Sequence, residues 1–171
     1  MKRTIRISLT ILTAVLLGLL LLVLSTNLSI IRPSITIEQK YLDSLVALQD
    51  LADQQGEYPV SALVIYRDRI IGAGYNTFRR DNDPLGHAEI NAFENVFAGM
   101  DYFKFRALSR DSLILISSYE PCPMCKGVIN HLDIRKIYYM QPKKFRLRMK
   151  YLRKELSFNL KTRRIKAPED Q

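Results

Sequence analysis

The sequence contains few residues that bind metals or form disulfides, with only two cysteines and two histidines among 171 residues. The two cysteines, Cys122 and Cys125, lie so close together that no disulfide framework links distant parts of the chain. A structural zinc site usually takes four protein ligands, whereas a catalytic site takes three and leaves one position for water. The cysteines and His87 supply three, and the other histidine, His131, reads as an ordinary helix residue. This scarcity of ligands favours an open, catalytic type of metal site.

Charged residues are absent from residues 7–31, and residues 11–24 are almost wholly aliphatic. A run of this length is long enough to cross the hydrocarbon core of a bilayer. Lys2, Arg3 and Arg6 precede it, as in an uncleaved anchor or a signal peptide. Because the run exceeds the usual apolar region of a signal peptide, we expect a retained single-pass transmembrane helix. The basic residues favour the cytoplasm, so the rest of the chain is placed, by a small margin, on the extracytoplasmic side.

The chain does contain a compact group of chemically reactive residues. His87 and Glu89 flank a single alanine, and Cys122 and Cys125 follow downstream in the segment Pro-Cys-Pro-Met-Cys. Two cysteines at this spacing, in a turn that opens into a helix, can aim both sulfur atoms at one metal. The N-terminus of that helix favours negative charge and prepares the thiolates as ligands. The pattern therefore predicts a site for Zn²⁺.

Glu89 is the candidate acid and base of this site. It lies in the first turn of a helix predicted over residues 87–97, near the metal without joining it. A carboxylate in that place is suited to move protons at a water molecule on the metal. A lone C-x-x-C is more often a structural half-site or a redox pair, and a lone H-x-E is common by chance. Only their combination favours a hydrolytic site.

Four blocks of sequence, in the same order, resemble the cytidine and deoxycytidylate deaminase superfamily, and within it the branch of tRNA-adenosine and guanine deaminases. The pattern H-x-E…P-C-x-x-C is the known signature of the zinc-dependent base deaminases. The resemblance implies an α/β fold with three layers, α/β/α, around a mixed five-stranded sheet. The blocks are residues 59–65, 71–76, 83–89 and 120–125.

The resemblance also assigns roles within the site. His87, Cys122 and Cys125 hold Zn²⁺, and hydroxide on the zinc attacks the ring carbon that bears the amino group. Glu89 is the catalytic proton shuttle. Asn76 matches the asparagine that binds the substrate base, although asparagine after a strand also suits a turn.

Apolar periodicity predicts an α/β core in the middle of the chain. Strands that alternate with helices are typical of a partly parallel sheet covered on both faces. A capping-box spacing between Thr36 and Gln39 predicts the start of the first core helix. The other expected elements are strands over residues 60–66, 70–75, 113–117 and 134–140, and helices over residues 87–97 and 122–132.

The basic character of the protein comes from its ends. Residues 143–166 hold 11 basic residues against the single acidic Glu155, whereas residues 32–142 hold 12 basic and 14 acidic residues. Such a tail can bind RNA phosphates, lie on anionic lipid beside the anchor, or form a solvated helix without a partner. With an anchor expected, lipid ranks above RNA. The predicted domains are a membrane helix (1–31), a zinc-dependent deaminase domain (32–142), and a basic helix and tail (143–171).

Together these features predict a membrane-anchored, zinc-dependent hydrolase that deaminates a nucleobase, nucleoside or nucleotide, with a purine as the expected base. One alternative is a tRNA adenosine-to-inosine deaminase. Another is a non-catalytic, zinc-stabilised interaction module on the membrane, which the presence of Glu89 argues against. The resemblance further implies a homodimer. Ser61 departs from the glycine that the family's first strand often carries, and a serine there would narrow the pocket or add a hydrogen bond.

Overall fold

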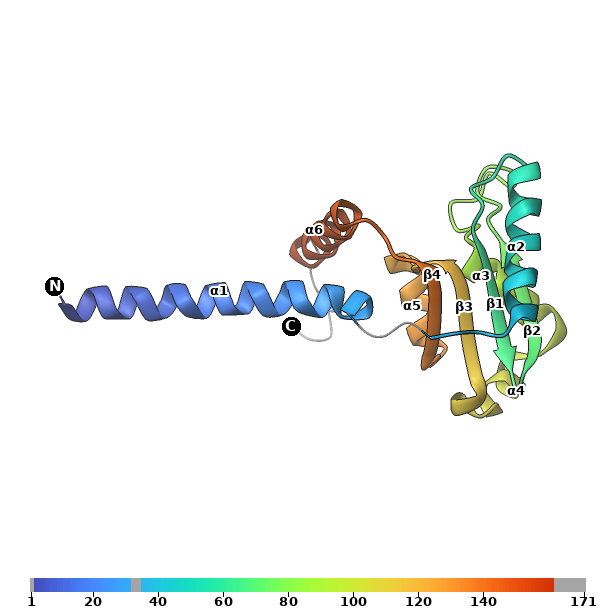
Figure 1. Cartoon of the computed structure of the whole chain (residues 1–171), viewed down its shortest axis with the longest axis horizontal. Coiled ribbons are helices and arrows are strands. Elements are labelled where there is room, and N and C mark those ends of the chain that lie inside the picture. Colours follow the sequence, from blue (N-terminus) through green and yellow to red (C-terminus); the bar gives the residue numbers. More distant parts are fainter. Residues whose placement is uncertain (1, 32–34, 162–171) are drawn as a thin grey trace, which may run out of the picture. The chain divides into compact units, whose positions relative to one another are not determined.

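The structure is a computed structural model that describes residues 2–31 and 35–161 of the chain. Side-chain environments are described for residues 10–24, 35–155 and 157. The chain separates into two compact units, Met1–Thr36 and Ile37–Gln171. The elements, labelled in Figure 1, are α1 (Lys2–Ile31), α2 (Gln39–Gln54), β1 (Ser61–Tyr66), β2 (Arg69–Tyr75), α3 (Ala88–Gly99), α4 (Tyr102–Ala107), η1 (Arg110–Ser112), β3 (Leu113–Tyr119), α5 (Pro123–His131), β4 (Lys136–Gln141) and α6 (Phe145–Lys161).

The first unit consists of helix α1, whose described side chains, over residues 10–24, are all exposed. A membrane span needs about 20 consecutive apolar residues. Among the residues whose side chains are described, 10–24 in α1, no helix offers a stretch long and apolar enough to cross a membrane. The expected transmembrane helix was therefore wrong, and with it the single-pass, extracytoplasmic localisation.

The second unit is built on a mixed sheet with strand order β2-β1-β3-β4. Strand β1 pairs antiparallel with β2 and with β3, whereas β3 and β4 are parallel. The α/β deaminase-like architecture is thus confirmed, but the described part of the chain forms four strands and not five. Pro142 follows β4 directly and has no N–H to continue a ladder, and the chain then turns into helix α6.

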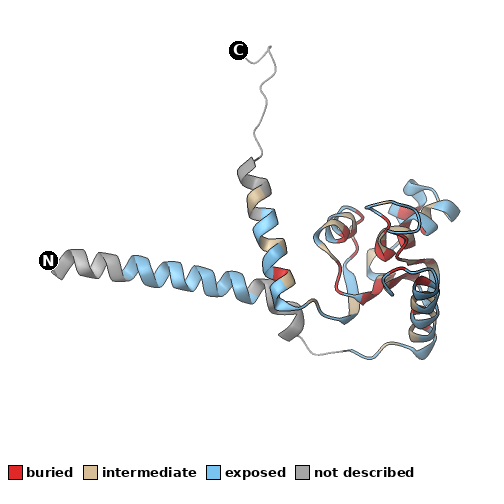
Figure 2. Cartoon of the chain, turned by 90° about the horizontal axis from the view of Figure 1, so that it is seen from above, coloured by how far each residue is buried: buried red, intermediate tan, exposed pale blue. Residues whose placement is uncertain are grey.

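Strand β1 shows why the sheet is covered on both faces. Its side chains alternate: Leu63 and Ile65 pack with α2, whereas Ala62 and Val64 join the larger cluster formed with α3 and α5. Figure 2 shows this concentration of buried residues in the sheet and the helices that cover it. The two helices that begin at His87 and Cys122 therefore share one face of the sheet.

Glycines in β2 allow α3 to lie unusually close to the sheet. A Cβ atom added to Gly74 would lie 2.4 Å from the backbone nitrogen of Ala92 and 2.5 Å from the carbonyl oxygen of Ala88. At Gly72 it would lie 2.4 Å from the carbonyl oxygen of Ala92. Backbone contact of this kind leaves no room for a side chain, and it fixes the N-terminus of α3 against the sheet.

Several boundaries differ from expectation. Helix α2 has Glu38 as its N-cap and no side-chain capping bond, so the capping box expected from Thr36 is not formed. Between α3 and β3, where no helix was expected, the chain forms the short helix α4, which Asp101 caps by accepting a hydrogen bond from the backbone of Lys104. The basic tail forms α6 as far as Lys161, and residues 162–171 of that predicted segment lie outside the described residues. The three-domain division stays a prediction.

Candidate metal centre

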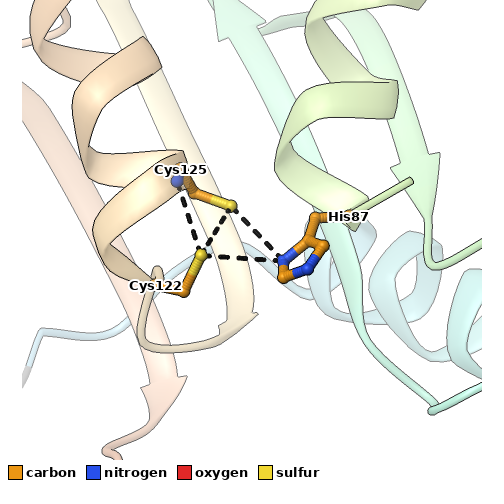
Figure 3. A group of neighbouring side chains, drawn as sticks. All are labelled: His87, Cys122 and Cys125. Carbon is orange, nitrogen blue, oxygen red and sulfur yellow. Dashed lines mark hydrogen bonds between the residues drawn. The ribbon is translucent and has the colours of Figure 1, made fainter. Parts of the chain in front are cut away.

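Two helix N-termini on the same face of the sheet carry the three predicted ligands. His87 is the N-cap of α3, and Cys122 is the N-cap of α5, with Cys125 in the first turn of that helix. The sulfur of Cys122 accepts a hydrogen bond from the backbone N–H of Cys125, as an N-cap side chain does. Figure 3 shows the three side chains turned toward one another from the two helices.

The distances within this group fit a tetrahedral zinc ion. The Nδ1 atom of His87 lies 3.7 Å from Cys122 Sγ and 3.6 Å from Cys125 Sγ, and the two sulfur atoms are 3.4 Å apart. Ordinary zinc–ligand bond lengths at tetrahedral angles place a sulfur and a nitrogen about 3.6 Å apart, and two sulfurs about 3.8 Å apart. Among the described residues, this is the group of three or more His, Cys, Asp and Glu side chains close enough to hold a metal ion. Three soft and borderline donors with a fourth position left open suit a catalytic zinc.

The pKa values of the two cysteine thiols are shifted in opposite directions. The side-chain hydrogen bond with Cys125, the nearby His87 and the backbone N–H of Cys125 lower the pKa of Cys122 well below that of an ordinary thiol. The neighbouring Cys122, burial and the carboxylate of Glu89 raise the pKa of Cys125. The hydrogen bond with Cys122 raises the pKa of His87. Cys122 is thus a ready thiolate, whereas Cys125 gives up its proton when a metal binds.

Glu89 is buried at the edge of this group, with only 3% of its surface exposed. One carboxylate oxygen accepts a hydrogen bond from the Ser117 hydroxyl over 3.3 Å, and the other lies 3.4 Å from Cys125 Sγ. Ser117 lies in β3, so the sheet orients a carboxylate that the first turn of α3 presents. The sequence offered no motif for Ser117, and its role comes from strand register alone.

Asn76 follows β2 and is 6% exposed. Its segment is held by Asn91 of α3, whose side-chain amide donates to the carbonyl oxygen of Tyr75 over 2.7 Å and to the hydroxyl of Thr77 over 3.0 Å. Among the described residues, no hydrogen bond joins the Asn76 side chain to the three candidate ligands. Its role in binding the base stays a prediction.

Ser61 is fully buried at the start of β1. Alternation along the strand places its side chain on the face that carries Leu63 and Ile65, because Ala62 faces α3. The Ser117 hydroxyl approaches the carbonyl oxygen of Ser61 rather than its side chain. The expected effect of this serine on the pocket is therefore not supported by the strand geometry.

A cavity of about 420 Å³ opens beside the three candidate ligands. Its walls come from α3, α5 and, unexpectedly, α6. Burial raises the pKa of the Tyr151 hydroxyl, and the negative charges of Cys122 and Cys125 add to that shift. The α6 residues lie outside every sequence block of the pattern, so the pattern did not predict them as part of the site. The lining residues are His87, Cys122, Pro123, Met124, Tyr151, Lys154 and Glu155.

Residues 35–141 match the family of the cytidine and deoxycytidylate deaminase zinc-binding region. A tRNA-specific adenosine deaminase of Buchnera aphidicola is 31% identical over 102 residues, which cover 60% of this chain and 60% of that protein. The guanine deaminase of Bacillus subtilis is 32% identical over 81 residues, which cover 47% of this chain and 49% of that protein. The chain thus spans less than two thirds of the length of these two relatives.

A solved structure of guanine deaminase from Bacillus subtilis aligns with a TM-score of 0.60 and 21% identity, covering 79% of this chain and 89% of that one. At this identity the likeness shows the fold alone. The family match confirms the enzyme class expected from the sequence, a zinc-dependent hydrolase, and the group of His87, Cys122 and Cys125 supports Zn²⁺ as the metal. None of these matches supports the added membrane helix.

Proposed function

Because the chain belongs to the cytidine and deoxycytidylate deaminase family, we propose that it hydrolytically deaminates a nucleobase, free or within a nucleoside or nucleotide. His87, Cys122 and Cys125 are the proposed zinc ligands. Zinc on such a set supplies Lewis-acid chemistry and makes water a nucleophile near neutral pH. The observation that carries the proposal is the buried carboxylate of Glu89 beside three ligands that leave a fourth position open.

Glu89 performs the proton transfers in this proposal. Its carboxylate takes a proton from the attacking water and delivers protons to the ring nitrogen and to the departing amino group. The carbon–nitrogen bond breaks, ammonia leaves, and a carbonyl oxygen from water replaces the amino group. Ser117 holds one carboxylate oxygen, so that Glu89 keeps its orientation through these transfers.

The cavity suits a planar base. Pro123, Met124 and Tyr151 give it apolar walls, and His87 and Cys122 place the metal position at one side. Apolar walls with a few polar groups are typical of small-molecule sites. Asn76 is the proposed contact to the edge of the base. A purine is proposed because the guanine and tRNA-adenosine deaminases among the relatives act, by their names, on purine bases.

A second candidate is deamination of adenosine within tRNA, the activity that the Buchnera relative is named for. Lipid ranked above RNA only because an anchor was expected, and that expectation was wrong. Lys150 and Arg153 are exposed on α6, the helix whose Lys154 lines the cavity. Exposed cations next to a base-sized pocket favour a substrate with a phosphate backbone.

The non-catalytic interaction module is the weaker reading. A carboxylate costs free energy to bury unless its charge is used or paired. Within the described residues Glu89 has a hydroxyl and a thiol as hydrogen-bond partners and no ion pair. A fold kept only for structure would gain nothing from this arrangement.

Ammonia release by the zinc-loaded full chain tests the proposal and separates the two substrates. The panel holds adenine, guanine, cytosine, their nucleosides and nucleotides, and an unmodified tRNA. Turnover of small molecules alone supports the first candidate, and turnover of tRNA alone supports the second. Silence across the panel, with zinc bound, would contradict both.

A homodimer is the proposed assembly, on the strength of the family resemblance alone. Native mass spectrometry of the zinc-loaded protein should give twice the mass of one chain. A monomer over the whole working concentration range would contradict it.

A further inference from the structure

Helix α6 takes part in the candidate metal centre although it lies outside the matched residues 35–141. Tyr151, Lys154 and Glu155 line the cavity together with His87 and Cys122. A wall contributed by one helix can shape a pocket only if that helix is held in place. The contacts that hold α6 therefore bear on the site.

Glu120 is the hub of those contacts. It is 5% exposed and lies between the end of β3 and the metal-binding turn, two residues before Cys122. Its backbone N–H donates to the carbonyl oxygen of Gln141 over 2.9 Å, which ties the turn to the end of β4. Its side chain accepts a hydrogen bond from the backbone N–H of Lys143, in the segment that leads into α6.

Arg148 reaches Glu120 from the first turns of α6. Arg148 is 8% exposed, its guanidinium donates to Glu120 Oε2 over 2.5 Å, and its Nε donates to the carbonyl oxygen of Lys143 over 3.3 Å. A buried, charge-assisted pair of this kind has a fixed geometry. Arg148 precedes Tyr151 by three residues, so both side chains lie on the same side of the helix.

Two lysines complete the cluster. Lys143 donates its backbone N–H to Glu120 Oε2 over 3.1 Å and its ammonium group to the Glu120 carbonyl oxygen, and Lys126 of α5 lies 3.2 Å from Glu120 Oε1. The ammonium group of Lys143 also lies 6.0 Å from the centre of the Tyr151 ring. One carboxylate therefore links the start of α5, the end of β4 and the first turns of α6.

We propose that the Glu120–Arg148 ion pair is a latch that fixes α6 as a wall of the metal-centre cavity, with Tyr151 as the residue that contacts the substrate base. The contact between Tyr151 and substrate rests on the proposed function, whereas the latch does not. Arg148 and Glu120 are positioning residues, because they act on the substrate only through the placement of Tyr151.

Hydrogen exchange on the zinc-loaded full chain tests the latch without any substrate. Removal of one partner from a buried ion pair is strongly destabilising, so Arg148→Met should speed exchange of the α6 amides at least about tenfold, with α3 unchanged. Arg146→Met is the matched control, since Arg146 is exposed on the same helix, and it should leave exchange unchanged. Equal exchange in both variants would overturn the latch.

Two further variants guard against a general loss of folding. Arg148→Lys keeps the charge but not the paired geometry and should give an intermediate exchange rate. In the double variant Glu120→Gln, Arg148→Met, the second change should add little to the first, because the two residues act as one pair. Independent, additive effects would overturn the latch even if each variant were less stable.

Steady-state kinetics test the contact with the base. Stacking on an aromatic ring is worth about 1–3 kcal/mol per base, which corresponds to a rise in KM of about fivefold or more for Tyr151→Ala, with kcat changed less. Tyr151→Phe, which keeps the ring, should restore KM. Unchanged KM in Tyr151→Ala would overturn the contact. If the wild type turns over no substrate while exchange responds to Arg148→Met, the proposed function fails and the latch stands.

Discussion

At the scale of single residues, the site depends on how one carboxylate is held. Glu89 has Ser117 on one oxygen and Cys125 on the other. When zinc takes the Cys125 sulfur, that thiol no longer donates, and Ser117 becomes the hydroxyl that keeps Glu89 oriented. The proposed proton shuttle, Glu89, and the residue that orients it, Ser117, therefore come from α3 and β3.

Ser117→Ala tests this orientation. A hydrogen bond to a charged group contributes about 1.5–3 kcal/mol, so we expect kcat to fall at least about tenfold while KM and the zinc content stay the same. Steady-state kinetics with metal analysis of the same samples give the answer. If this variant kept the wild-type kcat, Ser117 would not be the residue that orients the carboxylate of Glu89.

The grouping of the three candidate ligands was predictable from sequence because their chemistry is local to two short motifs. His87 and Glu89 are two positions apart, and Cys122 and Cys125 are three apart, so spacing carries the geometry. Ser117 and Tyr151 were not predictable. They reach the site through strand register and helix placement, which no short motif encodes.

At the scale of elements, close packing of α3 on β2 positions His87, the candidate ligand at the N-terminus of α3. Gly74→Ala would place a methyl group against the backbone of α3. We expect it to lower the free energy of unfolding by about 2 kcal/mol, the usual effect of overpacking. Gly127→Ala is the matched control, because nothing lies within 4 Å of its added Cβ in the middle of α5.

The control should raise stability by about 0.5–1 kcal/mol, since alanine favours a helix more than glycine does. Urea unfolding of both variants measures the difference. If Gly74→Ala were as stable as the wild type, the close approach of α3 to β2 would be refuted.

The cap of helix α4 predicts a dependence on pH. The backbone N–H and the ammonium group of Lys104 lower the pKa of Asp101 below its model-peptide value of 3.8. A lowered pKa in the folded state means that Asp101 stabilises the fold above pH 3.8, and that this stabilisation is lost as the pH falls through the folded pKa. In the variant Asp101→Asn, the asparagine side chain can still cap the helix but carries no charge that depends on pH.

We therefore expect the wild type to be more stable than Asp101→Asn at pH 7, and the difference to disappear in acid. Thermal unfolding of both proteins across the pH range tests this. A difference that stays constant from pH 7 to pH 2 would contradict a role for the charge.

Element by element, the sequence predicted most of the core. Strands β1 to β4 and helices α3 and α5 lie within a few residues of their expected ranges, since apolar periodicity follows burial directly. The prediction of a fifth strand was wrong. It came from the family resemblance alone, and no pattern in the residues after Pro142 had indicated a strand. The capping box was wrong because Glu38 provides the N-cap.

At the scale of the whole molecule, the expectation for the N-terminal run was not met. A stretch without charges predicted a membrane span, yet no such helix is found among the described residues. For the basic tail the structure shows more order than its composition predicts, because part of the tail has a defined place in the fold. Arg148 is buried in an ion pair, whereas a charge run by itself predicts only a solvated face.

Zinc should stabilise the molecule as a whole, because its ligands come from two helices that meet only in the folded state. Zinc at 1,000 times its Kd adds about 4 kcal/mol, which corresponds to a rise in Tm on the order of 10 °C for a unit of this size. Differential scanning calorimetry with zinc and with a chelator measures it. Cys125→Ser should lose most of the shift, and an equal shift in that variant would exclude Cys125 as a ligand.

The most direct test is ammonia release during a zinc titration of the metal-free full chain, on the best substrate of the panel. The account predicts that activity rises in proportion to zinc and levels off at about one equivalent, as a single site requires. Glu89→Gln should bind the same amount of zinc and release ammonia at least about a hundredfold more slowly. Activity without zinc, or activity that survives in Glu89→Gln, would contradict the account.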